Sequence, residues 1–204
     1  MLLEILQKVN LLDILIFLLF LRTISIALQK GFAVELFKLL GYLLATYLAL
    51  HYYTICSDLA GKAFGLRMAS VEFLDFFCFI LLAFLGYNFF VLVRFVFVRK
   101  RPAEEEMSSL TRWGGAALGV IRGVLMNALI IFGLVASTFG YFKTQVAESF
   151  MGRALFDVSP VVYYWTWHNL TSTVSGDEQI NPTVKEVQKS VSRHSRTQGE
   201  DDDS

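Results

Sequence analysis

The sequence predicts an all-α, polytopic membrane helix bundle of about four transmembrane helices, and three observations lead to this fold class. Hydrophobic residues make up 55% of the 204 residues, charged residues only 18%, and the mean hydropathy is +0.53. A water-soluble domain could not hide so much apolar surface in one core, so lipid must be the solvent for much of it. The 19 Phe and 8 Tyr against 3 Pro favour long, unbroken helices over a turn-rich β architecture.

Four apolar runs are long enough to cross a bilayer, whose hydrocarbon core of about 30 Å requires roughly 20 apolar residues per helix. The predicted spans are Leu11 to Leu28, Phe32 to Ile55, Val71 to Val98 and Trp113 to Phe142. The first run could be mistaken for a secretory signal because Lys8 precedes it. It is long, however, contains Asp13 and Arg22, and is followed at once by another span, so we interpret it as an uncleaved helix.

The connections between the spans differ in length and charge. Residues 29–31 are too few for a folded loop, so the first two spans should form a tight helical hairpin. The segment 99–106 is the most charged connection, whereas the only basic residues of the middle loop are Lys62 and Arg67. Because basic residues favour the cytoplasmic side, the first and third turns should be cytoplasmic. Both termini are therefore predicted to lie outside the cytoplasm.

The chain beyond the fourth span should leave the bilayer core. Between residues 143 and 170, charges are interspersed with apolar side chains and an aromatic run follows, which predicts amphipathic and interfacial helices. Residues 171–204 are polar and end in an acidic run, and they bury too little surface to offset their ordering entropy. We therefore expect a transmembrane domain at 1–142, an interfacial segment at 143–170 and a disordered tail at 171–204.

The fourth span carries a glycine at every fourth position, namely Gly115, Gly119 and Gly123. This spacing puts the three glycines on one face of a helix, where small residues let another backbone approach closely. In lipid, such packing is the main attraction available between helices. We therefore predict a helix-packing face whose partner is either another span or a second copy of the chain.

Several ionisable residues lie within or beside the spans, where an unpaired charge is costly and marks either a structural pair or a functional pathway. Near the span ends, long cations such as Arg22 and Arg94 are interpreted as reaching the headgroups. Asp13, Glu35 and Arg122 remain as the intramembrane residues of interest. Either structural pairing or a translocation role would account for them.

Glu35 has two candidate partners. Lys38 lies on the same helical face and could neutralise it, and Arg122 could reach it from the fourth span. We predict that Glu35 and Arg122 approach each other near the cytoplasmic side. A weak internal similarity between the second and fourth spans puts Glu35 in register with Asn127, as a parallel two-hairpin repeat would.

No signature of a soluble enzyme emerges from the sequence. It contains no phosphate-binding glycine loop, and His51, His168 and His194 are scattered among unlike environments. Cys56 and Cys78 match no metal spacing and are expected to be apolar packing residues rather than a disulfide. Basic and acidic residues are equal at 18 each, which gives no argument for nucleic acid. We therefore predict no catalytic residues, no cofactor, no metal and no nucleic-acid partner.

Two stretches carry a resemblance to a known family. One runs from Asp13 to Gly31-Phe32-Ala33-Val34-Glu35, and the other contains Arg112-Trp113-Gly114-Gly115, Gly119 and Arg122-Gly123. Both the order and the spacing of these glycines and charges are similar to those of the colicin V production protein family. The resemblance covers roughly residues 11–141 and implies a small bacterial inner-membrane protein required for colicin V production and its export or processing. It implies no catalytic residues.

Two hypotheses about function follow. The first is a non-enzymatic accessory or scaffold of the bacterial inner membrane, acting in colicin V or peptide-toxin production or export and in envelope homeostasis. Its expected partners are the lipid bilayer, a second copy of the chain, and membrane export or envelope proteins. The alternative is a small transporter or channel whose path is lined by Asp13, Glu35 and Arg122, and ion flux in liposomes would separate the two.

Overall fold

The computed structural model describes residues 10–64, 71–97, 108–137, 140–171 and 179–201, and the regular elements in these ranges are helices. Four of them are long and apolar enough to cross a membrane, which confirms the predicted class of membrane helix bundle. They are α2 (Leu11–Lys30), α3 (Phe32–Phe64), α4 (Val71–Phe97) and α5 (Ser109–Ala136). The shorter helices are α6 (Gly140–Glu148), α7 (Phe150–Phe156), α8 (Val158–Thr166), the π-helix η1 (Trp167–Thr171) and α10 (Pro182–Asp201).

The α2–α3 connection is the tight hairpin that the sequence predicts. Gly31 alone separates the two helices, and its φ of 78° lies in the left-handed region that glycine adopts without strain. At the other end of α2, the Asn10 side chain accepts a hydrogen bond from the Leu12 backbone N–H at 3.1 Å. This contact caps the helix at its first turn.

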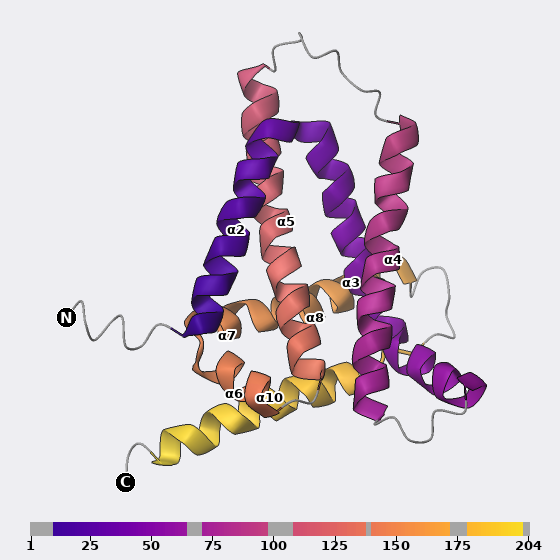
Figure 1. Ribbon diagram of the computed structural model, residues 1–204, viewed down its shortest axis with the longest axis vertical. Coiled ribbons are helices and arrows are strands. Elements are labelled where there is room, and N and C mark those ends of the chain that lie inside the picture. Colours follow the sequence, from indigo (N-terminus) through magenta and orange to yellow (C-terminus); the bar gives the residue numbers. More distant parts are fainter. Residues whose placement is uncertain (1–9, 65–70, 98–107, 138–139, 172–178, 202–204) are drawn as a thin grey trace, which may run out of the picture.

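The long helices are arranged around α5. In Figure 1, α2 and α3 diverge from their common turn, α5 lies between them, and α4 runs alongside α3. In the most apolar 18-residue stretch of α5, 61% of the residues are buried, whereas the corresponding share is 17% in α2 and in α4. The central helix is therefore α5, while α2 and α4 leave much of their surface to lipid.

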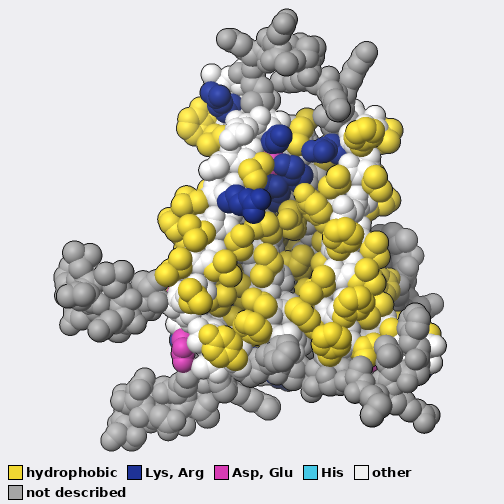
Figure 2. Space-filling model, viewed as in Figure 1, with side chains coloured by type: hydrophobic (Ala, Val, Ile, Leu, Met, Phe, Trp, Pro, Cys, Tyr) yellow, Lys and Arg dark blue, Asp and Glu magenta, His cyan; other side chains and the backbone are white. Residues whose placement is uncertain are grey.

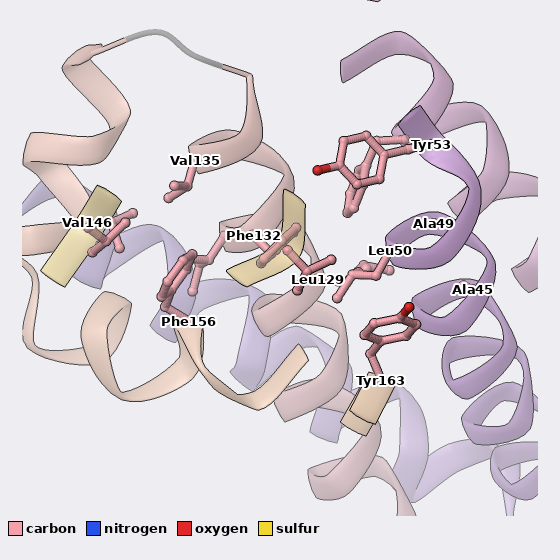
Figure 3. Close-up of a cluster of buried hydrophobic side chains, with 14 of the residues drawn as sticks. Ala45, Ala49, Leu50, Tyr53, Leu129, Phe132, Val135, Val146, Phe156 and Tyr163 are labelled. Atoms are coloured by element: carbon pink, nitrogen blue, oxygen red, sulfur yellow. The ribbon is translucent and has the colours of Figure 1, made fainter. Parts of the chain in front are cut away.

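The helices α6, α7, α8 and α10 gather at the end of the bundle opposite the α2–α3 turn (Figure 1). The hydrophobic core sits where they meet α3 and α5. Figure 3 shows Leu50 and Tyr53 from α3 facing Phe132 from α5, with Phe156 from α7 beside them. The rings of Phe132 and Phe156 stack with centroids 5.8 Å apart. The short helices thus close one end of the bundle through aromatic and aliphatic contacts.

Two spans end at places that differ from the expected ones. Helix α3 continues past Ile55 to Phe64, so it is about 50 Å long, more than the hydrocarbon thickness requires. Helix α5 ends at Ala136 rather than Phe142, with Ser137 as its C-cap, and Tyr141 and Phe142 belong to the separate helix α6. The charged connection 99–106 lies outside the described residues.

The structure also differs from the expectation for part of the tail. Pro182–Asp201 form α10, and its Val184 and Val191 side chains, 0% and 6% exposed, belong to the hydrophobic core. Average composition conceals this because Val184, Val187 and Val191 recur at helical spacing and form a narrow apolar stripe on a polar helix. The rest of the tail, residues 172–178 and 202–204, lies outside the described residues.

Candidate functional site

The best-defined charged site in the bundle is built on Glu35, in the first turn of α3. Its side chain is completely buried. Oε1 accepts a hydrogen bond from Lys38 Nζ at 2.5 Å, and Oε2 lies 3.0 Å from Arg122 Nε. The second contact is an ion pair without an aligned hydrogen bond. A buried carboxylate is costly unless it is paired, and these two cations offset that cost.

Arg122 connects three spans at this site. Its backbone belongs to α5, its Nε faces the Glu35 carboxylate of α3, and its Nη2 donates to the Thr23 carbonyl of α2 at 3.3 Å. The Arg122 side chain is only 7% exposed. The structure thus brings Glu35 and Arg122 together, and Lys38, the alternative partner considered from the sequence, contacts Glu35 at the same time.

The three glycines of α5 face α2 and the hairpin turn. An added β-carbon at Gly115 or at Gly123 would lie 2.9 Å from its nearest neighbour, closer than real carbon contacts. The nearest neighbours are the Gly31 backbone for Gly115, the Ala27 side chain for Gly119 and the Phe20 ring for Gly123. The partner of this face in the structure is therefore α2 of the same chain.

Asp13 lies far from this cluster, in the first turn of α2. Its Oδ1 accepts hydrogen bonds from Ser149 Oγ at 2.6 Å and from the Met151 backbone N–H at 2.9 Å. Thr23, where Arg122 contacts α2, lies about 15 Å further along the helix axis. Asp13 therefore anchors the junction of α6 and α7 to α2, and the structure does not bring it together with Glu35 and Arg122.

Asn127 is buried in α5 at 1% exposure. Its Nδ2 donates to the Gly123 carbonyl of the same helix at 2.8 Å, while its Oδ1 has no hydrogen-bond partner in the described part of the chain. Among the residues that the structure describes, no hydrogen bond joins Asn127 to Glu35. Asn127 therefore takes no part in the Glu35 cluster, although α3 and α5 run in the same direction, as the internal similarity requires (Figure 1).

A second polar cluster, which sequence reasoning missed, joins α3, α8 and the start of α10. The buried Tyr163 hydroxyl accepts a hydrogen bond from the Asn181 backbone N–H at 3.0 Å and lies 2.8 Å from His51 Nδ1. Asn181 Nδ2 donates to the Leu50 carbonyl at 2.8 Å. His51, which no sequence pattern places in a polar cluster, is buried in this junction. The helix-start pair Asn181-Pro182 is the sequence signal that could have located it.

The chemistry of these clusters is that of structural pairing. Glu35 offers both carboxylate oxygens to cations of the same chain, and Asp13 serves as a hydrogen-bond acceptor. Within the described ranges, no three His, Cys, Asp or Glu side chains gather closely enough to hold a metal ion. Cys56 and Cys78 are free thiols.

Comparison with protein families matches residues 12–160 to the family described as "Colicin V production protein". The match runs from the start of α2 into α8, so it includes Asp13, the Glu35 cluster and the glycine face. Asn181 and α10 lie beyond it. No curated protein and no solved structure gives a match.

Proposed function

The chain belongs to the colicin V production protein family, and from this premise we propose that it is a non-enzymatic membrane scaffold for peptide-toxin production or export. The same role extends to maintenance of the bacterial envelope. Family membership indicates the process, and the four candidate spans indicate a lipid bilayer as the environment. The geometry favours a helix bundle held in one arrangement over a bundle that contains a path for a transported ion.

The observation that supports a scaffold best is the way the intramembrane charges are used. Glu35 is completely buried, and Arg122 ties its carboxylate to the α2 backbone, so the charges join three spans. Asp13, which a transport path would have to include, holds the short helices at the other end. Charges that fasten helices to one another stabilise one arrangement of the bundle, and a scaffold requires such an arrangement.

The core between these two ends also favours a fixed frame. Leu129 and Phe132 of α5 are 6% and 0% exposed and pack with Leu50 and Tyr53 of α3 (Figure 3). An ion passing from the Glu35 cluster towards Asp13 along α5 would have to displace these apolar side chains. Dense apolar packing of this kind opposes the passage of charge.

Co-purification tests the scaffold directly. A tagged chain, extracted in mild detergent from toxin-producing cells, should carry export or envelope proteins at a fixed ratio, measured by mass. Toxin secretion from cells lacking the chain should be restored by the wild type and by the Gly61→Ala variant, because a β-carbon at position 61 meets nothing within 4 Å. Secretion restored without any co-purifying protein would contradict the scaffold.

Liposome flux tests the alternative of a small transporter or channel. Purified protein in liposomes should give no ion flux above that of empty liposomes, because Glu35 is occupied by Lys38 and Arg122. Flux that depends on the protein and disappears in Glu35→Gln would favour the transporter instead. A lysine-to-glutamine change at the exposed Lys62 is the matched control for purification and insertion.

A further inference from the structure

Basic side chains gather near the α2–α3 turn, on the face of the bundle seen in Figure 2. Lys38 of α3 and Arg122 of α5 both contact Glu35. Arg94 lies in the last turn of α4, one turn beyond Phe90. Phe90 packs against Gly41 of α3, one turn after Lys38, so Arg94 lies level with Lys38 and within its electrostatic range. Cations from three helices therefore converge at one level of the bundle.

The cations in this cluster outnumber the anions. Among the described residues, Glu35 is the carboxylate that contacts Lys38 and Arg122, and each of its two oxygens already faces one of these cations. Arg94 has no hydrogen bond or ion pair with any described residue. The cluster therefore keeps a net positive charge, and Arg94 is the cation free to contact an additional anion.

Arg94 lies at the boundary of the apolar surface rather than beyond it. Phe95 and Phe97, which follow it at the end of α4, are 75% and 74% exposed, and Leu110 and Trp113 in the first turns of α5 are 85% and 71% exposed. Side chains of this kind face lipid and its interface. A cation at this depth is costly without an anionic partner, and its long side chain can reach the phosphate level.

We propose that this basic cluster binds the phosphodiester headgroup of an anionic phospholipid, with Arg94 as its main contact. Guanidinium and ammonium groups form charge-assisted hydrogen bonds with phosphate oxygens. Basic pockets between membrane helices recognise lipid headgroups in this way. Hydrophobic side chains cover the same face below the basic ones (Figure 2), which gives the acyl chains an apolar surface that a free phosphate ion could not use.

The test uses the full chain in a mild, uncharged detergent, titrated with phosphatidylglycerol, with phosphatidylcholine or with inorganic phosphate. The readouts are the midpoint of thermal unfolding and the lipid retained per chain in native mass spectrometry. Phosphatidylglycerol alone should raise the midpoint. The Arg94→Gln variant should need about fivefold more phosphatidylglycerol for the same rise, the change expected when one basic residue near an anionic lipid is removed.

Two control variants make the result specific. Lys62→Gln removes an exposed cation at the opposite end of α3 and should respond as the wild type does. Arg94→Lys keeps the charge and should retain most of the response. Without lipid, Arg94→Gln should unfold at the wild-type midpoint, because Arg94 contacts no described partner. Equal effects of phosphatidylcholine or inorganic phosphate, or an unchanged response in Arg94→Gln, would overturn the proposal.

Discussion

Gly119 of α5 packs so closely against Ala27 of α2 that a β-carbon at position 119 would overlap the Ala27 methyl group. Ala27 itself is 0% exposed. Because close backbone approach is the main source of attraction between helices in lipid, this contact sets how α2 meets the central helix. The same approach brings Thr23 of α2 within reach of Arg122.

Gly119→Ala should therefore lower the free energy of unfolding by about 1–3 kcal/mol, the usual cost of overpacking. Gly61→Ala is the matched control, because a β-carbon there meets nothing within 4 Å and alanine favours a helix by up to about 1 kcal/mol. Denaturant titration in detergent measures both. Equal or opposite effects of the two changes would show that the α2–α5 contact does not depend on glycine.

Asp13→Ala should loosen the junction of α6 and α7 from α2. The change leaves Ser149 Oγ and the Met151 backbone N–H without their acceptor, at a cost of about 1–3 kcal/mol. Asp13→Asn keeps an acceptor oxygen and should lose less. Hydrogen exchange at the Met151 amide reports the effect directly, and an exchange rate unchanged in Asp13→Ala would rule out the anchoring role.

Asn181→Ala should release α10 from the bundle. Asn181 donates to the Leu50 carbonyl, and its side chain also caps α10 by accepting from the Thr183 N–H at 3.1 Å. We expect faster hydrogen exchange from Val184 to Val191 and cleavage of α10 by protease. Gln188→Ala, which removes an exposed hydrogen bond to Asp157, should leave exchange unchanged. Similar exchange in both variants would contradict docking through Asn181.

The orientation in the membrane remains a prediction from the basic turns. Helix α2 begins, and α10 lies, at the end of the bundle opposite the α2–α3 turn (Figure 1), so one side of the membrane should hold both. A reporter that is active only in the cytoplasm should be silent when fused at Ser204 and active when inserted at Pro102. The reverse pattern would invert the topology.

The spans and the hairpin could be predicted because hydropathy, length and a gap of only three residues between two apolar runs are properties of short stretches of sequence. The contact between Glu35 and Arg122 could also be predicted, because a charge in an apolar span requires a partner. The involvement of Thr23 could not, because it is the backbone carbonyl rather than the side chain that Arg122 contacts.

The role of Asp13 and the docking of α10 could not be predicted for a different reason. Asp13 contacts Ser149, and Asn181 contacts Leu50, across sequence separations of 136 and 131 residues. No local pattern encodes such pairs. The average composition of the tail is polar, and an average takes no account of the helical spacing on which burial depends. The valine stripe that includes Val184 was therefore missed.

The central claim is that Glu35 and Arg122 hold the bundle together as direct partners, and a double-mutant cycle tests it most directly. Glu35→Gln and Arg122→Gln are measured singly and together by unfolding in detergent. Each single change should cost up to about 3–5 kcal/mol, as breaking a buried pair does. The double variant should cost less than their sum by about 1 kcal/mol or more. The distant pair of Asp13→Asn and Arg122→Gln should be additive. Additivity of Glu35 and Arg122 within about 0.5 kcal/mol would contradict the claim.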